Sequence, residues 1–193
     1  MILAFPGNED FAARLGAFDR IDVHTFPDGE SRVRVPALVA GQDIVVVATL
    51  DRPDPKFLPL AFALRALRQL GARRIRLVAP YLCYMRQDIA FEPGEAVAAG
   101  FVADLISGLC DGLITVDPHL HRIANLDAIY RVPATTVHAA PALSAWVLEN
   151  ARDPVIIGPD GESAQWAEEV ARGAGAPSTV LQKVRHTATA MSR

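Results

Sequence analysis

The segment IVVVATLDRPDPKFLPLAFALRALRQLGARRIRLVAP, residues 44–80, contains two apolar runs separated by a helical repeat. Residues 44–48 are apolar without interruption, which is typical of a strand buried on both faces of a sheet. Leucines then recur at helical spacing over residues 57–70, and Gly71 is a typical residue just beyond a helix end. A second strand is predicted over residues 74–79. A strand, a helix and a strand in this order predict two parallel strands joined by a crossover helix.

The same alternation continues on both sides of this segment. Upstream, a strand is expected over residues 2–5 and a hairpin over residues 22–35, with Pro27-Asp28-Gly29 at its tip. Downstream, we expect helices over residues 95–110, 141–150 and 163–172, and strands over residues 113–116, 155–157 and 178–181. The helix over 95–110 carries Val97, Phe101, Leu105 and Leu109 at helical spacing. The predicted fold class is therefore α/β with parallel sheets.

Proline and small residues between Val132 and Pro141 predict a boundary between two α/β units. We expect a first domain over residues 1–138, which includes the hairpin, and the start of a second over residues 139–193.

The composition excludes several classes of protein. Hydrophobic residues make up 51% and charged residues 21% of the 193 residues, which predicts a folded core. The net charge of -3 is unlike that of a nucleic-acid-binding protein, and no apolar stretch is suitable as a membrane span. The N-terminal residues have no basic region before their short apolar run, which argues against a secretory signal. Two cysteines outside any Cys-x-x-Cys spacing predict free thiols. We expect a soluble, cytoplasmic protein.

Ionisable residues follow four of the predicted parallel strands. Ligands of open parallel sheets bind beyond the carboxyl ends of the strands. The segments at these ends are Pro80 to Asp88, Asp117 to Arg122, Gly158 to Ser163 and Gln182 to Arg185. Their mixture of acidic and basic groups suits a metal-bound polyphosphate, because carboxylates bind Mg²⁺ while arginine and lysine neutralise phosphate oxygens.

Each segment also has a purely structural interpretation. Asp117 and His119 lie on one side of an extended segment and so reach a common ion, yet most such pairs only form local hydrogen bonds. The tripeptide Arg86-Gln87-Asp88 is typical of a solvated loop. Asp160 before Gly161 is also typical of a helix N-cap.

The segments near the two ends of the chain also have a purely structural interpretation. Lys183 and Arg185 alternate on a predicted strand, where exposed basic residues are common, and residues 26–30 suit a simple hairpin turn. The chain contains neither a Walker loop nor a Gly-x-Gly-x-x-Gly motif, so a nucleotide would be held in another way.

In chain order, five of these segments resemble the ribose-phosphate pyrophosphokinase family, also called phosphoribosyl pyrophosphate synthetases. The matching segments are FPDGE (26–30), PYLCYMRQD (80–88), TVDPH (115–119), GPD (158–160) and QKVR (182–185). The match covers nearly all of this chain but only the N-terminal and middle part of the family's usual chain. It implies two phosphoribosyltransferase-like α/β units with parallel sheets, the second of which is incomplete here.

The resemblance implies a diphosphoryl transfer from Mg·ATP to the 1-hydroxyl of ribose 5-phosphate, which gives phosphoribosyl pyrophosphate and AMP. The implied cofactor is Mg²⁺. In this family the hairpin tip reaches the adenine of ATP bound by a neighbouring subunit. A homo-oligomer that shares its ATP site between subunits is therefore implied. No nucleic-acid or membrane partner is expected, because the charge and composition argue against both.

The resemblance also implies roles for individual residues. Phe26, Asp28 and Glu30 match the hairpin contacts to ATP, and the implied nucleotide-binding residues of the main site are Arg86, Gln87, Asp88 and His119. The implied metal contacts are His119 and Asp160, to which Asp117 is added as the neighbour of His119. Lys183 and Arg185 match the family's catalytic basic pair.

The chain departs from the family in several respects. Residues 89–91 replace a basic stretch, and Val184 stands where a third basic residue is common, which suggests a divergent branch. The family's pentose-phosphate loop contains a Thr-Gly turn, and no Thr-Gly pair occurs in the 193 residues. We therefore expect a truncated chain that is inactive by itself.

Three other functions stay open on the sequence alone. The first is a non-catalytic nucleotide-binding homologue that regulates a synthetase by co-assembly. The second is a phosphoribosyltransferase-like protein that consumes phosphoribosyl pyrophosphate. The hairpin at Phe26 argues against this second function. The third is an unspecific α/β nucleotide-binding module.

Overall fold

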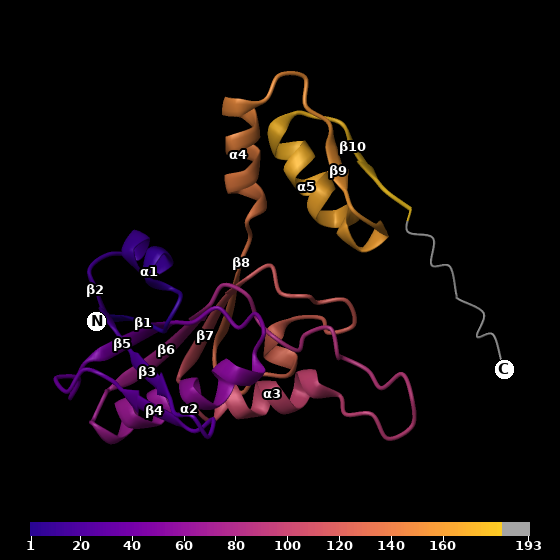
Figure 1. Cartoon of the computed structure of the whole chain (residues 1–193). Coiled ribbons are helices and arrows are strands. Elements are labelled where there is room, and N and C mark those ends of the chain that lie inside the picture. The colour runs from indigo at the N-terminus through magenta and orange to yellow at the C-terminus, as the bar shows by residue number, and fades with distance from the viewer. Residues whose placement is uncertain (183–193) are drawn as a thin grey trace. The chain divides into compact units, whose positions relative to one another are not determined.

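The structure is a computed structural model that describes residues 1–182 and divides the chain into two compact units, Met1–Val137 and His138–Arg193. The first unit is built around a parallel sheet, and the second pairs two helices with two short strands (Figure 1). No helix in the described part of the chain has the length and apolar character needed to span a membrane.

The sheet of the first unit has six strands in the order β2-β1-β5-β6-β7-β8, and every neighbouring pair is parallel. Its strands are β1 (Ile2–Ala4), β2 (Phe18–Arg20), β5 (Asp43–Val47), β6 (Arg74–Ala79), β7 (Gly112–Val116) and β8 (Ala134–Val137). Val46, Leu77 and Leu113 stand side by side in the register of the central strands and are almost completely buried. The predicted α/β class with a parallel sheet is confirmed.

Helices cover both faces of this sheet. The helices α2 (Asp54–Gln69) and α3 (Ala98–Ser107) lie on one face, and α1 (Glu9–Leu15) lies on the other (Figure 1). The leucines of α2 that recur at helical spacing form its buried side, as predicted. Burying one such side chain stabilises the fold by about 1.5–3 kcal/mol.

The helix α3 packs through a different side from the one that the apolar spacing indicates. Phe101 is 61% exposed, and Leu105 is also exposed. The buried side instead contains Ala99 and Ala103, together with larger apolar residues. The small alanine side chains allow the helix to approach the sheet closely, which leaves the bulkier row facing outward.

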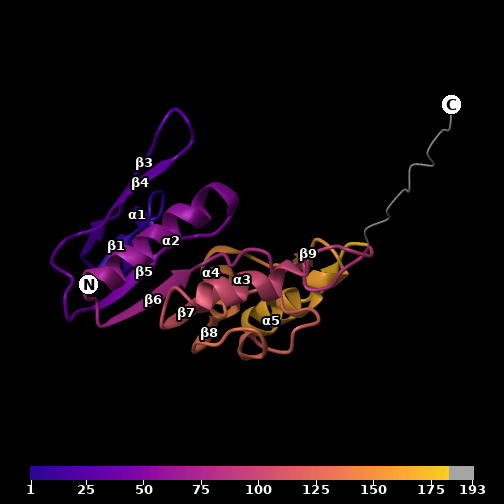
Figure 2. The same cartoon turned by 90° about the horizontal axis from the view of Figure 1, so that it is seen from below.

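The hairpin is formed by β3 (Asp22–Thr25) and β4 (Ser31–Arg34), which pair antiparallel as expected. Thr25 lies opposite Ser31, so the turn comprises the residues between them. Gly29 has a φ of 90°, a value that side chains other than glycine rarely adopt. The hairpin projects from the body of the unit (Figure 2).

Over residues 138–182, the second unit contains two α-helices and two parallel strands, β9 and β10. Its elements are α4 (Ala140–Asn150), β9 (Ile156–Gly158), the short 3-10 helix η2 (Gly161–Ser163), α5 (Ala164–Ala174) and β10 (Ser178–Val180). The hydroxyl of Ser144 on α4 is buried and donates toward the carbonyl of Val170 on α5 at 3.0 Å. Gly173 lies against Ser144 and leaves no room for a side chain there.

Candidate functional site

Three loops meet where β5, β6 and β7 end. They comprise residues 48–53, 80–88 and 117–122. Backbone hydrogen bonds join them, because the Leu50 amide donates to the Tyr81 carbonyl at 3.0 Å and the Val116 amide to the Pro80 carbonyl at 3.4 Å. Two of the ionisable segments that the sequence indicates, residues 80–88 and 117–122, therefore lie at one edge of the sheet.

Each of these loops holds one residue in a strained backbone conformation. Within residues 1–182, positive φ values at non-glycine residues occur at Arg52 (48°), Tyr84 (60°) and Asp117 (39°), and at Asp153 in the second unit. Such conformations cost roughly 1–3 kcal/mol each and cluster at ligand sites. Their presence in three adjacent loops supports a functional role for this edge.

Asp88 connects two of the loops. Its side chain is 0% exposed, and its Oδ1 accepts a hydrogen bond from Nη1 of Arg122 at 2.9 Å. The other carboxylate oxygen, Oδ2, is buried and has no hydrogen-bond partner in the described structure. Leaving a buried carboxylate oxygen unpaired is costly, so Oδ2 is a candidate acceptor for a donor brought by a ligand. The neighbouring Arg86 and Gln87 are exposed.

A pocket of about 360 Å³ opens beside Gln87, between the first two loops. Asp51, Arg52, Tyr81 and Tyr84 also line it. The Lys56 ammonium donates to the carboxylate of Asp51 at 2.5 Å and lowers the pKa of that carboxyl group. The Tyr84 hydroxyl donates to the carboxylate of Asp54, which raises the tyrosine pKa.

The sequence-based prediction did not include the loop from Asp51 to Asp54. This loop follows the apolar run over residues 44–48, and the rule that ligands bind beyond strand ends would have identified it. Asn8 was also missed. Its buried amide donates to the carbonyls of Phe5 and Pro6, and its Oδ1 accepts from the Thr49 amide at 2.8 Å, which fixes the ends of β1 and β5 together.

Asp117 and His119 lie in the third loop. The Asp117 amide donates to the Val137 carbonyl at 3.0 Å, and the rings of His119 and His121 are 6.1 Å apart. Among residues 1–182, no three His, Cys, Asp or Glu side chains converge as a metal site.

The hairpin tip presents an aromatic side chain on a turn held by hydrogen bonds. Phe26 is 41% exposed, and its ring packs edge-on against His24 with centroids 4.9 Å apart. The Asp28 carboxylate accepts a hydrogen bond from the Glu30 amide at 3.1 Å, and the Glu30 carbonyl accepts one from the Phe26 amide at 2.8 Å. Asp28 and Glu30 therefore shape the turn, in agreement with the interpretation of residues 26–30 as a simple hairpin turn.

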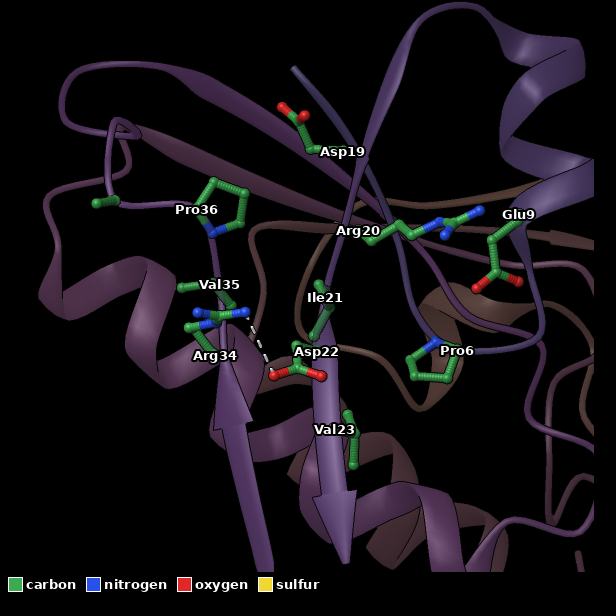
Figure 3. A pocket seen from close by; sticks show the side chains of 11 residues that line it. Pro6, Glu9, Asp19, Arg20, Ile21, Asp22, Val23, Arg34, Val35 and Pro36 are labelled. Carbon is green, nitrogen blue, oxygen red and sulfur yellow. Dashed lines mark ion pairs between the residues drawn. The ribbon is translucent and has the colours of Figure 1, made fainter.

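A second pocket, of about 720 Å³, lies at the base of the hairpin (Figure 3). Asp22 stands between Arg32 and Arg34, with a separation of 3.7 Å to each, and Glu9 and Arg20 line another part of the pocket. These ion pairs are exposed, so each stabilises the fold by at most about 1 kcal/mol. The pocket contains none of the residues that the sequence indicates for ligand binding.

Asp160 belongs to the second unit, where it caps a helix. Its Oδ1 accepts a hydrogen bond from the Ser163 amide at 3.1 Å, and the Ser163 hydroxyl accepts one from the Asp160 amide at 3.2 Å. This reciprocal pair is a capping box, so the interpretation of Asp160 as an N-cap is confirmed. Lys183 and Arg185 lie outside the described residues.

Comparisons with known proteins agree on one family. A sequence profile for the N-terminal domain of ribose phosphate pyrophosphokinase matches residues 9–109. The ribose-phosphate pyrophosphokinase of Halobacterium salinarum is 37% identical over 97% of this chain and 67% of the relative. That of Methanopyrus kandleri is 38% identical over 86% of this chain and 56% of the relative.

A solved structure gives the same result. The phosphoribosylpyrophosphate synthetase from Mycobacterium smegmatis superposes with a TM-score of 0.82 and 25% sequence identity, over 96% of this chain and 65% of the other. The present chain thus spans from 56% to 67% of the length of these proteins.

Proposed function

The chain belongs to the ribose-phosphate pyrophosphokinase family, and from this we propose that it forms the ATP-binding part of an enzyme that makes phosphoribosyl pyrophosphate. The reaction transfers the diphosphoryl group of Mg·ATP to the 1-hydroxyl of ribose 5-phosphate and releases AMP. The observation that carries this proposal is the match of nearly the whole chain to an enzyme of that name. Because the relatives are longer, the proposed activity is that of the whole protein.

We assign the nucleotide to the loops that follow β6 and β7. The exposed Arg86 guanidinium suits a phosphate oxygen, because arginine forms paired charge-assisted hydrogen bonds with such groups. Gln87 lines the adjacent pocket, and the buried Oδ2 of Asp88 accepts a hydrogen bond from the nucleotide. His119 stands in the adjoining loop and contacts the metal-bound phosphates.

The Mg²⁺ ion would neutralise part of the triphosphate charge. We assign its protein contacts within the first unit to Asp117 and His119, of which the carboxylate is the harder ligand. Mg²⁺ usually keeps several waters and binds through one or two carboxylates together with substrate phosphates. The absence of a converged three-residue cluster among residues 1–182 is compatible with an ion that arrives bound to ATP.

The proposed chemistry is mainly positioning and charge neutralisation. The 1-hydroxyl of the pentose attacks the β-phosphorus of ATP, the bond from that phosphorus to the α-phosphate oxygen breaks, and AMP leaves. Lys183 and Arg185 stabilise the negative charge of the migrating group, where their effect is greatest in the transition state.

The hairpin supports a site shared between subunits. An exposed aromatic ring on a projecting, hydrogen-bonded turn is suited to contact a flat base beyond its own subunit. We propose that Phe26 contacts the adenine bound by a neighbouring copy, with Asp28 and Glu30 as polar contacts. A homo-oligomer is then required for full affinity.

Product analysis of the native gene product tests this function. With Mg·ATP and ribose 5-phosphate we expect AMP, and we expect none when the pentose is omitted. Lys183→Ala should abolish AMP formation while ATP binding is retained. ATP binding without AMP formation in the unaltered protein would instead support the non-catalytic, regulatory homologue.

A further inference from the structure

A basic pocket lies at the opposite edge of the main sheet, where β6, β7 and β8 begin. It has a volume of about 690 Å³, and its lining includes Arg74, Arg76, Gly112 and Thr135. The length of β6 from Arg74 to Ala79 separates this edge from the candidate nucleotide loops by about 17 Å. A ligand in this pocket is therefore distinct from one at the carboxyl ends of the strands.

The pocket is positively charged although the whole chain has a net charge of -3. Arg73 pairs with Asp43 at 2.8 Å, and Arg68 pairs with Asp111 at 2.6 Å. Within residues 1–182, Arg74 and Arg76 form no ion pair, and the lining of the pocket contains three guanidinium groups but only one carboxylate, that of Asp111.

The charges of Arg74 and Arg76 nevertheless affect the pKa of a neighbouring carboxyl group. The pKa of Asp43 is lowered by its hydrogen bond from Arg73, and the charges of Arg74 and Arg76 add to this effect. Arg74 and Arg76 thus act on carboxylates at longer range, while within residues 1–182 neither forms a direct ion pair.

The strand geometry directs these two cations to the same place. Arg74 and Arg76 are two residues apart on β6, so their side chains project from the same face, about 7 Å apart. Gly112 pairs with Arg76 in the sheet register, and a β-carbon at Gly112 would lie 3.7 Å from Cγ of Arg76 and 3.4 Å from the Pro133 carbonyl oxygen. The glycine thus leaves the floor of the pocket open.

The face that carries the pocket is only partly covered within the first unit. The helix α1 contacts β1 and β2, at the other end of the sheet. Thr135 is exposed on β8 and adds a hydroxyl donor beside the apolar surface of Ile114.

From this arrangement we propose that the pocket binds a small phosphate-bearing molecule, whose two adjacent phosphates contact Arg74 and Arg76. Two arginine forks at this spacing suit a diphosphate group. The volume lies within the range of about 300–1,000 Å³ found for small-molecule sites. The net charge of -3 disfavours a long polyanion, which favours a compact ligand over a nucleic acid.

Nuclear magnetic resonance with inorganic diphosphate tests this proposal on the full chain. We expect the backbone amide signals of Gly112 and Thr135 to shift and to saturate. The double variant Arg74→Ala/Arg76→Ala should weaken this response about 100-fold, as expected for the loss of two charge-assisted contacts. Gly112→Val, which fills the pocket floor without a change in charge, should also weaken it.

Two control variants distinguish this pocket from other sites. Arg65→Ala removes another exposed arginine, on α2, and should leave the response unchanged. Arg86→Ala alters the proposed nucleotide loop and should also leave it unchanged, so the test is independent of the proposed function.

The proposal is overturned if the two amide signals do not move, or if the double variant responds like the unaltered protein. It is also overturned if a single-stranded oligonucleotide binds the same amides more tightly than diphosphate.

Discussion

Asp88 is the residue that most clearly joins sequence, packing and proposed chemistry. Its carboxylate is completely buried at the point where two loops meet, and one oxygen is satisfied by Arg122. The other has no partner, which is unusual for a buried polar atom. The sequence identified Asp88 through its resemblance to a family motif, but it could not show that the side chain is buried or that Arg122 is its partner.

The Asp88–Arg122 pair leads to a prediction about stability. Arg122→Ala should lower the free energy of unfolding by about 1–3 kcal/mol, because it leaves a buried carboxylate without any partner. Arg122 is 45% exposed, so solvent screening keeps the loss below that of a fully buried pair. Asp88→Asn should cost less, since the buried charge is removed. Urea unfolding followed by circular dichroism measures both, and an Arg122→Ala variant as stable as the unaltered protein would contradict this account.

The buried thiol of Cys83 leads to a prediction about the stability of the protein in alkaline solution. Burial raises the pKa of its thiol from 9.0 to about 11. The folded state therefore holds this proton more tightly than the unfolded state. The contribution of the protonated thiol to the free energy of unfolding is complete below pH 9.0 and is lost as the pH rises toward about 11. Burial also raises the pKa values of Cys110 and Tyr130, in the same direction.

Urea unfolding at a series of pH values measures this effect. The free energy of unfolding should fall by about 1 kcal/mol per pH unit over this window. Cys83→Ala should make the fall shallower, and an equal slope in the two proteins would argue against the assigned cause.

At the scale of elements, the sequence predicted those whose apolar pattern reflects burial. The strands β5, β6 and β7 and the helix α2 have continuous or periodic apolar residues that face the core, and all four were predicted. The elements α1, β2 and β8 were missed. The first two are short, with seven and three residues, and β8 lies where prolines suggested a linker.

The helix α3 shows where an apolar pattern misleads. Its large apolar row is exposed, and its buried side relies on alanines, whose small size carries little signal in a sequence pattern. In a similar way, the candidate loop from Asp51 to Asp54 has no recognisable motif. It is identified instead by its position directly after β5, because ligands of parallel sheets bind beyond the strand ends.

The contact between α4 and α5 leads us to predict opposite effects on stability for alanine substitutions at two glycines. Gly173→Ala should lower the free energy of unfolding by about 1–3 kcal/mol, because its new methyl group collides with Ser144. Gly100→Ala on α3 is the matched control. No atom lies within 4 Å of its β-carbon position, so it should stabilise the protein by about 0.5–1 kcal/mol.

Tryptophan fluorescence is a suitable probe of the first variant, since Trp146 and Trp166 both lie in the second unit. Urea unfolding followed by this signal should occur at lower concentration for Gly173→Ala. Two glycine variants with the same effect would show that the helix contact is looser than described.

The hairpin makes a prediction about assembly. If Phe26 contacts adenine in a neighbouring copy, Phe26→Ala should weaken ATP binding about tenfold, in keeping with the loss of one aromatic contact of about 1–1.5 kcal/mol. His24→Ala removes the ring beside it and serves as a control for the hairpin itself. Calorimetric titration with Mg·ATP measures both variants.

Mixed oligomers test whether the site is shared. An assembly of Phe26→Ala subunits with Arg86→Ala subunits should recover part of the activity of the native gene product. Where the hairpin of an Arg86→Ala subunit reaches the nucleotide loop of a Phe26→Ala subunit, the shared site contains both an intact hairpin and an intact loop. A complete lack of recovery would indicate a site built within one subunit.

For the whole molecule, family membership and the placement of the loops at one edge of a parallel sheet point to the same nucleotide site. The sequence predicted the fold class and the loops after β6 and β7, because parallel strands bring their carboxyl ends to the same edge. It could not predict how Asp88 is held or the basic pocket at the opposite edge, since both depend on side chains that are distant in sequence. The roles of Asp160, Lys183 and Arg185 still rest on the resemblance.

The most direct test of the central claim is the affinity of this chain for a non-hydrolysable Mg·ATP analogue, measured by calorimetry. We predict that Arg86→Ala weakens binding at least about tenfold, while Arg65→Ala and the double variant Arg74→Ala/Arg76→Ala leave the affinity at this site unchanged. Binding that persists in Arg86→Ala and disappears in the Arg74→Ala/Arg76→Ala variant would contradict the account, because it would move the nucleotide to the opposite edge of the sheet.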